Sequence, residues 1–533
     1  MISLGKALKM GQTSATGGFH LFIGRILSTV FLAIGTIILQ LLISEGDYGL
    51  YTVALIPASA LLLFQDWGIS SAMIRKVANC RAMNKTEDLR SVIISGLAFQ
   101  AVTGLILTVL SFLMANFVAS TIFGKPESAF LITVASVSIF STALILASQS
   151  IFVGFERMKL SSLVTVCHAV AQFVMVPLLV YFGFGALGAT IGYSISLLVA
   201  GIVGLVTVYF GIWRRLSSDN TNKVVFFQSL KPMLKFGVPL AIATLIGGML
   251  TQFYSFMMAT YCELVIIGNY RTAINFALFL GFFTIPISTV LFPAFSKLDP
   301  KNELKLLKTV FESSVKYTAL LLVPATMALM VFSKPIIGTL YGAKWLDAPL
   351  LLSLFVISNL FAIFGNLSMG SLLPALGETK LLIKLNLLSL SVGVPMGFMI
   401  IPTFGIIGVI FVTLVAVLPS MFLGLFWLWK HFGIKADFSA SARVFFASSI
   451  AALTSYLFLY VFNMADWVRL LVGLPIFLSI YIVSVPLIGA ISNSDIANVR
   501  SVFSNLRIIS TLIEVPLRIV EKILRKRSSN TGV

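Results

Sequence analysis

The sequence is poor in acidic residues and in charge of any kind. Among 533 residues there are 19 Asp and Glu against 37 Lys and Arg, and charged residues make up 11% of the chain. Hydrophobic residues make up 58%, so a folded chain could not cover its surface with polar side chains, which excludes a water-soluble globular protein. The three cysteines, Cys80, Cys167 and Cys262, are too few and too widely spaced for a disulfide framework or a metal site. We therefore predict that the protein uses neither a metal nor another cofactor.

Long apolar stretches recur from one end of the chain to the other, separated by short polar connections. The sequence predicts an all-α polytopic membrane protein with about fourteen transmembrane helices, because each stretch is long enough to cross about 30 Å of hydrocarbon. The first stretch lacks a small-residue cleavage pattern, so we expect it to remain as a helix and not to be removed as a signal peptide. The predicted spans are 19–44, 48–74, 91–118, 128–153, 160–182, 186–211, 234–260, 264–294, 310–333, 348–370, 381–402, 405–430, 442–463 and 468–491.

The distribution of Lys and Arg predicts the orientation of these spans. With the N-terminus inside, about thirty Lys and Arg fall in the N-terminus, the alternate loops and the tail, and about four fall in the outer loops. Cationic loops resist translocation, so we expect a multi-pass protein of the cell membrane with both termini in the cytoplasm. The net charge of +18 then reflects topology, and we predict no nucleic-acid partner.

Two halves of the chain repeat the same short motifs at an offset of about 220 residues. Three matches occur in the same order, although each would be weak alone. Paired membrane halves are typical of transporters in which two lobes rock about a shared central cavity. The sequence therefore predicts two pseudo-symmetric six-helix lobes that work by alternating access, followed by two unduplicated helices. The matching segments are 49–54 and 268–273, 154–159 and 377–380, and 184–189 and 404–409.

This pattern divides the chain into five parts. In the last part, apolar residues recur every three or four positions between Arg and Lys, which indicates a basic amphipathic helix bent at Pro516. This helix would lie on the inner leaflet or bind a cytosolic partner. The predicted limits are 1–211 for the N-terminal lobe, 212–233 for a basic cytoplasmic linker, 234–430 for the C-terminal lobe, 431–491 for transmembrane helices 13 and 14, and 492–533 for the cytoplasmic tail.

Few charged residues fall within the predicted spans, and a charge inside a membrane normally faces a cavity or a partner. Arg25 in the first span, Arg271 in the eighth and Lys316 at the inner end of the ninth are candidates for binding an anionic substrate, because their cationic groups suit phosphate oxygens. Lys316 could instead snorkel to the inner interface. Arg25 could snorkel likewise or pair with Asp66 on the second span. Asp66 could also take part in cation or proton coupling.

Several motifs resemble those of one transporter family. Their order and spacing are similar to those of the polysaccharide-transport flippases, which belong to the multidrug/oligosaccharidyl-lipid/polysaccharide export superfamily. The resemblance covers about residues 15–430. The motifs are an Arg in the first span, then 45–51 (EGDYGLY) and 65–69 (QDWGI) in the first half, and 267–270 (IGNY), 292–296 (FPAFS), 335–337 (PII), 340–342 (LYG) and 376–380 (LGETK) in the second.

The resemblance implies a flippase that moves a lipid-linked oligosaccharide, carried on a polyprenyl phosphate or pyrophosphate, from the inner to the outer leaflet for cell-surface glycan assembly. Arg25 and Arg271 match positions where related flippases carry cavity arginines, and the last two helices could form a groove for the lipid tail. The implied partners are this substrate, membrane lipids and glycan-assembly enzymes. Many relatives carry an acidic residue within helix seven, where this sequence has 252–254 (QFY), so their cation-coupling scheme does not carry over directly.

Two other functions remain open. A cation-coupled multidrug exporter of the same superfamily would need carboxylates deep in its first lobe, and the first span offers Arg25 and no acidic residue. A membrane-embedded glycosyltransferase would need a carboxylate or metal constellation and a sizeable loop for the donor sugar, and the sequence shows neither. We therefore expect a transporter and not an enzyme.

Overall fold

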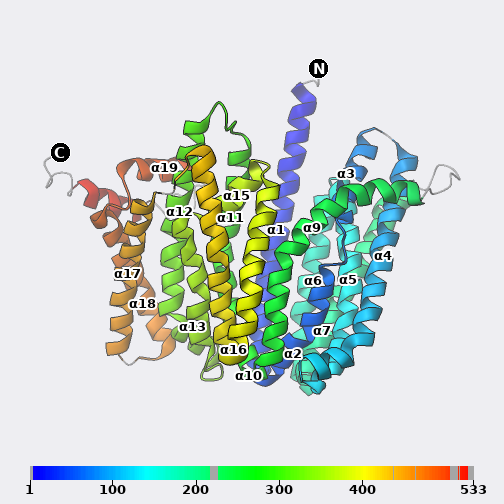
Figure 1. Ribbon diagram of the computed structural model, residues 1–533, viewed down its shortest axis with the longest axis horizontal. Coiled ribbons are helices and arrows are strands. Elements are labelled where there is room, and N and C mark those ends of the chain that lie inside the picture. Colours follow the sequence, from blue (N-terminus) through cyan, green and yellow to red (C-terminus); the bar gives the residue numbers. More distant parts are fainter. Residues whose placement is uncertain are drawn as a thin grey trace. The chain divides into compact units, whose positions relative to one another are not determined.

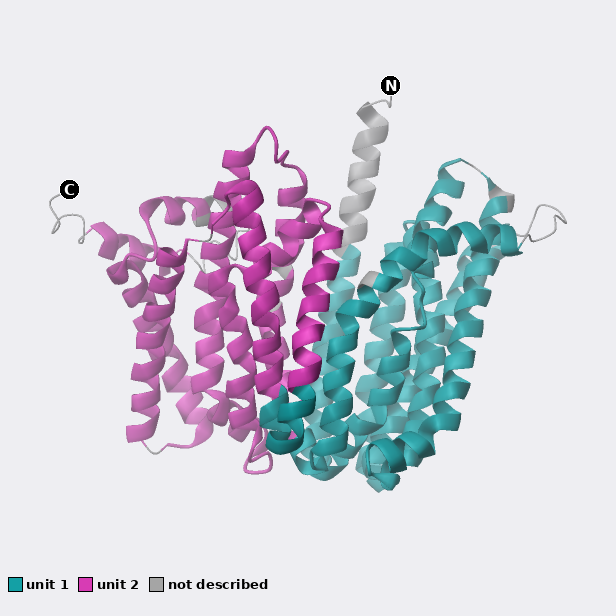
Figure 2. Cartoon of the chain, viewed as in Figure 1, with its two compact units in different colours: residues 1–268, 397–409 teal, residues 269–396, 410–533 magenta. Residues whose placement is uncertain are grey.

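The computed structural model of the chain is built from helices (Figure 1). It describes residues 4–83, 85–216, 226–435, 437–462, 464–503, 514 and 516–525, and every regular element in these ranges is a helix. The predicted all-α membrane fold is confirmed. The chain divides into two compact units (Figure 2): unit 1 comprises residues 1–268 and 397–409, and unit 2 comprises residues 269–396 and 410–533.

Unit 1 is a bundle of long apolar helices joined by short turns. The long helices are α1 (Leu4–Leu42), α2 (Glu45–Leu62), α3 (Ile69–Ala82), α4 (Thr86–Phe117), α5 (Ala129–Gly154), α6 (Met158–Leu179), α7 (Gly185–Val208) and α9 (Phe226–Tyr261). The short turns are η1 (Val118–Ile122), η2 (Pro126–Ser128), η3 (Val180–Phe184), η4 (Tyr209–Trp213) and α8 (Arg214–Leu216). α6 packs against α1 and α7, and α5 packs against α4 and α7. Met73, Phe152, Val164 and Met233 are fully buried in one core that joins α3, α5, α6 and α9.

Unit 2 alternates long helices with short ones. It contains η5 (Leu278–Leu280), α11 (Gly281–Ser296), α12 (Leu304–Val331), α13 (Ser333–Tyr341), α14 (Ala348–Phe355), η6 (Val356–Phe364), α15 (Asn366–Ala375), α17 (Phe438–Val461), α18 (Asp466–Ile488) and α19 (Asn493–Phe503). α10 (Leu264–Ala277) and α16 (Thr379–Phe432) each contribute residues to both units. α12 packs against η6 and α17, and α17 packs against α18. Phe332 and Phe477 are buried where α12, α13 and α18 meet, with their ring centroids 6.3 Å apart.

Two glycines of the repeated motifs adopt the same unusual backbone conformation. Gly185 has φ 49° and ψ −132°, and Gly405 has φ 55° and ψ −130°. This region is essentially closed to residues with a side chain. A second pair agrees: Glu156 (φ 59°) and Gly377 (φ 76°) both lie in the left-handed region. The chain therefore turns in the same way at corresponding positions of the two sequence repeats.

The number of membrane crossings depends on how bent helices are counted. Within the described residues, 8 helices are long and apolar enough to cross a membrane, or up to 11 if each bent pair forms one span. Two of the eight, Met158–Trp213 and Thr379–Phe432, contain 56 and 54 residues. At 1.5 Å per residue each would be about 80 Å long if straight, far more than about 30 Å of hydrocarbon, and each turns at Gly185 or Gly405. The count of fourteen remains a prediction.

The compact units do not follow the predicted lobe limits. α9, which the sequence assigns to the C-terminal lobe, packs against α2, α3 and α4 and belongs to unit 1. The predicted span 48–74 is broken, because α2 ends at Leu62 and α3 begins at Ile69. Residues 217–225 of the predicted linker lie outside the described residues. The five-part division remains a prediction.

Two helical segments of the predicted tail are described, α19 and residues 516–525. Arg500 of α19 forms ion pairs with Glu514 at 3.0 Å and with Glu521 at 3.2 Å, and so connects α19 to the second segment. Arg525 also pairs with Glu521. Glu514 and Glu521 thus compensate part of the basic charge of these segments. Residues 504–513, through which the sequence predicts a continuous amphipathic helix, lie outside the described residues.

Candidate functional site

Arg25 is exposed on α1. The adjacent Gly24 faces α6 so closely that a Cβ atom there would lie 2.7 Å from Cβ of Ser162, and Ser28, one turn further on, is also buried. This face of α1 holds the helix against α6, while Arg25 projects from another face. Arg25 forms no ion pair with any described residue, so the alternative pairing with Asp66 is absent from the structure.

Arg271 is exposed on α10 between buried neighbours. Asn269 and Thr272 are completely buried, and Asn269 Oδ1 accepts a hydrogen bond from the backbone N–H of Ala348 at the start of α14. These contacts fix the rotation of α10 and leave the Arg271 side chain exposed. Among the described residues, no carboxylate lies within ion-pair distance of Arg271. Arg25 belongs to unit 1 and Arg271 to unit 2, and a cavity shared by the two remains a prediction.

Lys316 is engaged in an ion pair. Its Nζ lies 2.5 Å from Oδ2 of Asp495 on α19, and the two side chains are 22% and 9% exposed. Asp495 also accepts hydrogen bonds from the Tyr317 hydroxyl at 3.1 Å and from the Ser492 backbone N–H at 2.8 Å. Asn498 of α19 donates to the same Tyr317 hydroxyl. Lys316 and Tyr317 therefore brace α12 against α19.

The pKa of Asp495 reflects two opposed effects. Burial alone would raise the pKa of this carboxyl, but hydrogen bonds from Lys316 and Ser492, together with the charge of Lys316, lower it below its usual range. The carboxylate is therefore ionised at neutral pH and the ion pair is complete. We call the residues Lys316, Tyr317, Ser492, Asp495 and Asn498 the tail brace.

Asp66 lies in the break between α2 and α3, where Trp67 and Gly68 have φ values of 49° and 73°. Its Oδ1 accepts hydrogen bonds from the Ser70 backbone N–H at 2.9 Å and from the Ser70 hydroxyl at 2.6 Å. Such bonds are typical of a carboxylate that satisfies free N–H groups at the start of a helix. A third bond comes from Nε2 of Gln100 on α4. Asp66 thus ties the start of α3 to α4.

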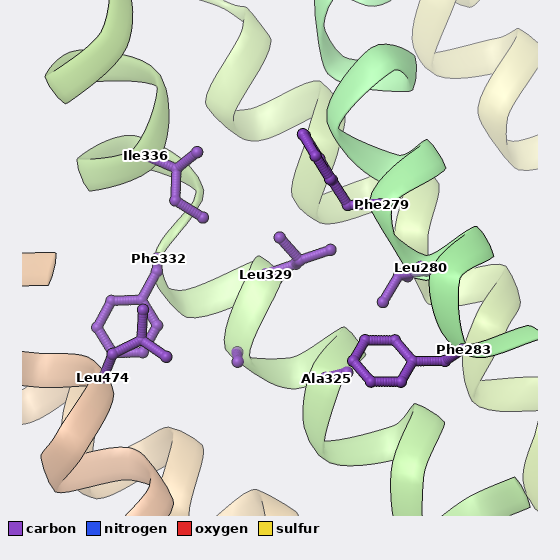
Figure 3. Close-up of a pocket in the computed structure, with 9 residues that line it drawn as sticks. Phe279, Leu280, Phe283, Ala325, Leu329, Phe332, Ile336 and Leu474 are labelled. Atoms are coloured by element: carbon purple, nitrogen blue, oxygen red, sulfur yellow. The ribbon is translucent and has the colours of Figure 1, made fainter. Parts of the chain in front are cut away.

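An apolar cavity of about 170 Å³ lies within unit 2. Figure 3 shows that Phe279, Leu280 and Phe283 approach it from one side, Leu329 and Phe332 from another, and Leu474 from α18. Ala325, Ala328 and Ile336 complete the lining. An aromatic and aliphatic surface of this kind suits a hydrocarbon chain and offers nothing to a sugar or a phosphate. The sequence did not predict these residues, although it suggested a tail groove involving the last two helices, of which α18 is one.

These features together define a class, the polytopic membrane transport proteins. They are the helical units, the exposed arginines within predicted spans and the apolar cavity. The chain belongs to the polysaccharide biosynthesis protein family, whose family model matches residues 38–349. The predicted resemblance to polysaccharide flippases is thereby confirmed.

Two relatives illustrate the family. The lipopolysaccharide biosynthesis protein WzxC of Escherichia coli (strain K12) is 23% identical over 406 residues, which cover 72% of this chain and 77% of that protein. The probable low-salt glycan biosynthesis flippase Agl15 of Haloferax volcanii is 24% identical over 282 residues, which cover 52% of this chain and 57% of that protein.

Solved structures support the same fold. The lipid II flippase MurJ in its inward closed conformation matches with a TM-score of 0.69 and 18% identity, over 89% of this chain and 98% of that chain. A multidrug resistance transporter of the MATE family in its inward-facing conformation matches with a TM-score of 0.63 and 16% identity, over 76% of this chain and 94% of that chain. At these identities the similarity concerns the fold alone, so it does not separate a flippase from a drug exporter.

Proposed function

We propose that this protein is a flippase that moves a lipid-linked oligosaccharide, carried on a polyprenyl phosphate or pyrophosphate, from the inner to the outer leaflet by alternating access. The single observation that carries the proposal is the state of Arg25 and Arg271, which are exposed within predicted spans and form no ion pair with any described residue. Placing an uncompensated guanidinium inside the membrane raises the free energy by about 2.5–3.5 kcal/mol. A bound anionic ligand would remove this penalty. The names of the relatives WzxC and Agl15 agree with a saccharide substrate.

The two arginines would hold the phosphate groups. A guanidinium donates two parallel hydrogen bonds to a phosphate, which an ammonium group does not do. In this proposal Arg25 of the N-terminal lobe and Arg271 of the C-terminal lobe each bind phosphate groups of the substrate. The apolar cavity beside α18 would take part of the polyprenyl chain. Lys316 is left out of this proposal, because its ammonium pairs with Asp495.

The charge distribution supports the proposed direction. The excess of Lys and Arg in alternate loops favours a cytoplasmic position for both termini. The substrate would enter from that side and leave on the other. Enzymes of glycan assembly are the expected neighbours, supplying the loaded carrier inside and using it outside.

The second candidate, a cation-coupled multidrug exporter, has less support. A cationic drug needs carboxylates or aromatic faces in the cavity. Asp66 already accepts three hydrogen bonds that position α3, and two uncompensated arginines would repel a cation. The match to a MATE transporter supports the shared fold only.

The test uses the full chain in liposomes that contain a fluorescent short-chain polyprenyl-pyrophosphate oligosaccharide. Exposure of the label on the far leaflet is followed by an external quencher. We expect Arg271→Ala to slow flipping by about tenfold to a hundredfold, since a charged hydrogen bond contributes about 1.5–3 kcal/mol, and Arg271→Lys to recover only part of the rate. Arg518→Ala, at an exposed Arg of the tail, is the matched control and should leave the rate unchanged. Equal rates for Arg271→Ala and the control would refute the phosphate-binding role.

A further inference from the structure

Eight lysines lie together at one end of unit 2. The end of α11, the start of α12 and both ends of α16 meet there in a single core, in which Phe295, Leu307, Leu385, Leu428 and Ile434 are buried. Each of these five residues lies within two positions of a lysine. The predicted topology places this end in the cytoplasm. We call the eight residues the lysine face: Lys297, Lys301, Lys305, Lys308, Lys380, Lys384, Lys430 and Lys435.

The carboxylates of the same loops are turned towards the backbone. Asp299 and Glu303 each accept a hydrogen bond from a backbone N–H of their own loop at 3.0 Å. Asp437 accepts one from the N–H of Ala440 at 3.0 Å, at the start of α17. Within the described ranges, no carboxylate forms an ion pair with a lysine of this face. With Glu378, four carboxylates stand against eight lysines, which leaves an excess of four positive charges.

Most of these ammonium groups are in contact with water. Lys308 is half-buried, and its Nζ would lie 3.0 Å from a Cβ atom at Gly433, the residue that ends α16. Lys435 lies over the ring of Trp429, with its Nζ 5.6 Å from the ring centroid. The other six lysines are exposed. The face is therefore a hydrated group of charges on flexible side chains.

Membrane topology explains why these loops are basic, but not which cation they carry. The loops of the lysine face contain no arginine. The predicted inner loops of unit 1 do carry arginines, and these are held in place: Arg75 and Arg90 stack on aromatic rings, and Arg157 donates to a backbone carbonyl. An ammonium on a flexible chain is a hydrated point charge, whereas a guanidinium makes fixed, bidentate contacts. The lysine face is thus suited to attract an anion without holding it.

Two helices connect the lysine face with the apolar cavity of the same unit. Phe283 of α11 lines the cavity and lies 14 residues before Lys297, which is about 21 Å along a helix. α12 begins between lysines of the face and reaches the cavity at Ala325. A lipid with its phosphate at the lysine face would therefore have its chain in the hydrocarbon beside α11 and α12.

We propose that the lysine face attracts the phosphate-bearing head group of the lipid-linked substrate at the inner leaflet and raises the rate at which the substrate binds. The proposal rests on the proposed function for the identity of the anion. The lysines are positioning residues, and no bond is made or broken at them. Electrostatic attraction of this kind raises association rates by about 10- to 1,000-fold. Salt weakens it, because the Debye length falls from about 10 Å at 0.1 M to about 3 Å at 1 M.

The first experiment measures capture of the substrate without transport. The full chain is placed in bilayer discs, where both leaflets are accessible, and energy transfer from its tryptophans to a dansyl-labelled polyprenyl-pyrophosphate oligosaccharide reports association. We expect the neutral set to associate about tenfold more slowly than wild type at 0.05 M salt and at the same rate at 1 M salt. Equal rates at low salt would overturn the proposal. The neutral set combines Lys301→Gln, Lys305→Gln, Lys384→Gln and Lys430→Gln, four exposed positions whose replacement removes the excess charge.

Two further sets separate charge from structure and from position. Arginine at the same four positions keeps the charge, so this set should associate at the wild-type rate; a rate as low as that of the neutral set would show a structural effect and refute the proposal. Thermal melting curves check that each set is folded. The positional control should keep the wild-type rate, and a loss equal to that of the neutral set would refute the assignment to unit 2. It combines Lys85→Gln, Lys159→Gln, Lys231→Gln and Lys235→Gln, all exposed in predicted inner loops of unit 1.

The last comparisons identify the anion and test the link to transport. A dansyl-labelled polyprenol without phosphate should associate at one rate at all salt concentrations. If a small fraction of phosphatidylglycerol in the discs removes the difference between wild type and the neutral set, the face binds bulk phospholipid and the proposal is wrong. In flipping assays the neutral set should be slow at low substrate and normal at saturating substrate. Salt-dependent capture without any flipping would support the lysine face and count against the proposed function, whereas flipping with equal capture by all sets would refute the lysine face alone.

Discussion

Removal of the Asp495 carboxylate should destabilise unit 2 by an amount that the tail brace allows us to estimate. Asp495→Asn keeps an acceptor for Tyr317 and for Ser492, but it removes the negative charge that lies 2.5 Å from the Lys316 ammonium. Deleting one partner of a fully buried pair costs about 3–5 kcal/mol, because the other charge is left uncompensated. Lys316 is 22% exposed and can be partly hydrated, so about 2–3 kcal/mol is expected, close to the value of a charged hydrogen bond.

The assay is thermal unfolding of the full chain in one detergent at neutral pH. For a unit of this size, 1 kcal/mol corresponds to about 2–4 °C, so Asp495→Asn should lower the midpoint by about 5–10 °C. Asp88→Asn is the matched control, because Asp88 lies 4.0 Å from Lys85 and both side chains are more than half exposed, a geometry that contributes about 0–1 kcal/mol. Equal shifts in the two variants would refute the estimate.

The double variant Lys316→Met with Asp495→Asn distinguishes the effect of an uncompensated charge in the tail brace from a general loss of stability. It removes both charges, so no uncompensated ion remains, and its midpoint should lie closer to the wild type than that of Asp495→Asn. The same set decides the role of Lys316 in transport. A phosphate-binding lysine would make Lys316→Met lose flipping while Asp495→Asn keeps it, whereas a brace affects flipping equally in both. Unequal flipping with equal stability would return Lys316 to the substrate site.

Two further predictions concern pH and backbone geometry. The pKa of Asp495 is lower in the folded protein than in the unfolded chain. Its contribution to stability is therefore present above the unfolded pKa of about 4 and is lost as the pH falls through the folded pKa. The difference in melting temperature between wild type and Asp495→Asn should be constant from pH 7 to about pH 5 and shrink only below about pH 4. Gly68→Ala should lower the free energy of unfolding by about 2–4 kcal/mol. A left-handed φ is strained for Ala, and the new Cβ would lie 2.2 Å from the Gly237 carbonyl oxygen. Gly124→Ala, at a left-handed position with nothing within 4 Å, should cost only about 1–2 kcal/mol; equal melting temperatures of the two variants would contradict the close contact.

The sequence was sufficient for the class of fold because bilayer crossing depends on local composition. A run of twenty apolar residues predicts a helix wherever it packs, and Gly185 and Gly405 could be recognised as corresponding positions from their motifs alone. The break between α2 and α3 was missed, because the predicted span 48–74 is continuously apolar except around Asp66. Trp67-Gly68 was the available signal, but a glycine inside an apolar run does not by itself show that a helix stops.

The partners of the candidate residues could not be predicted, since they are distant in sequence. Asp495 lies 179 residues from Lys316, and Gln100 lies 34 residues from Asp66. Charge and depth identified Lys316 and Asp66 as unusual, but those properties are the same for a brace, a helix cap and a ligand site. Arg25 and Arg271 differ from them in the structure, because both remain exposed and without an ion pair among the described residues, as a role in binding an anion requires.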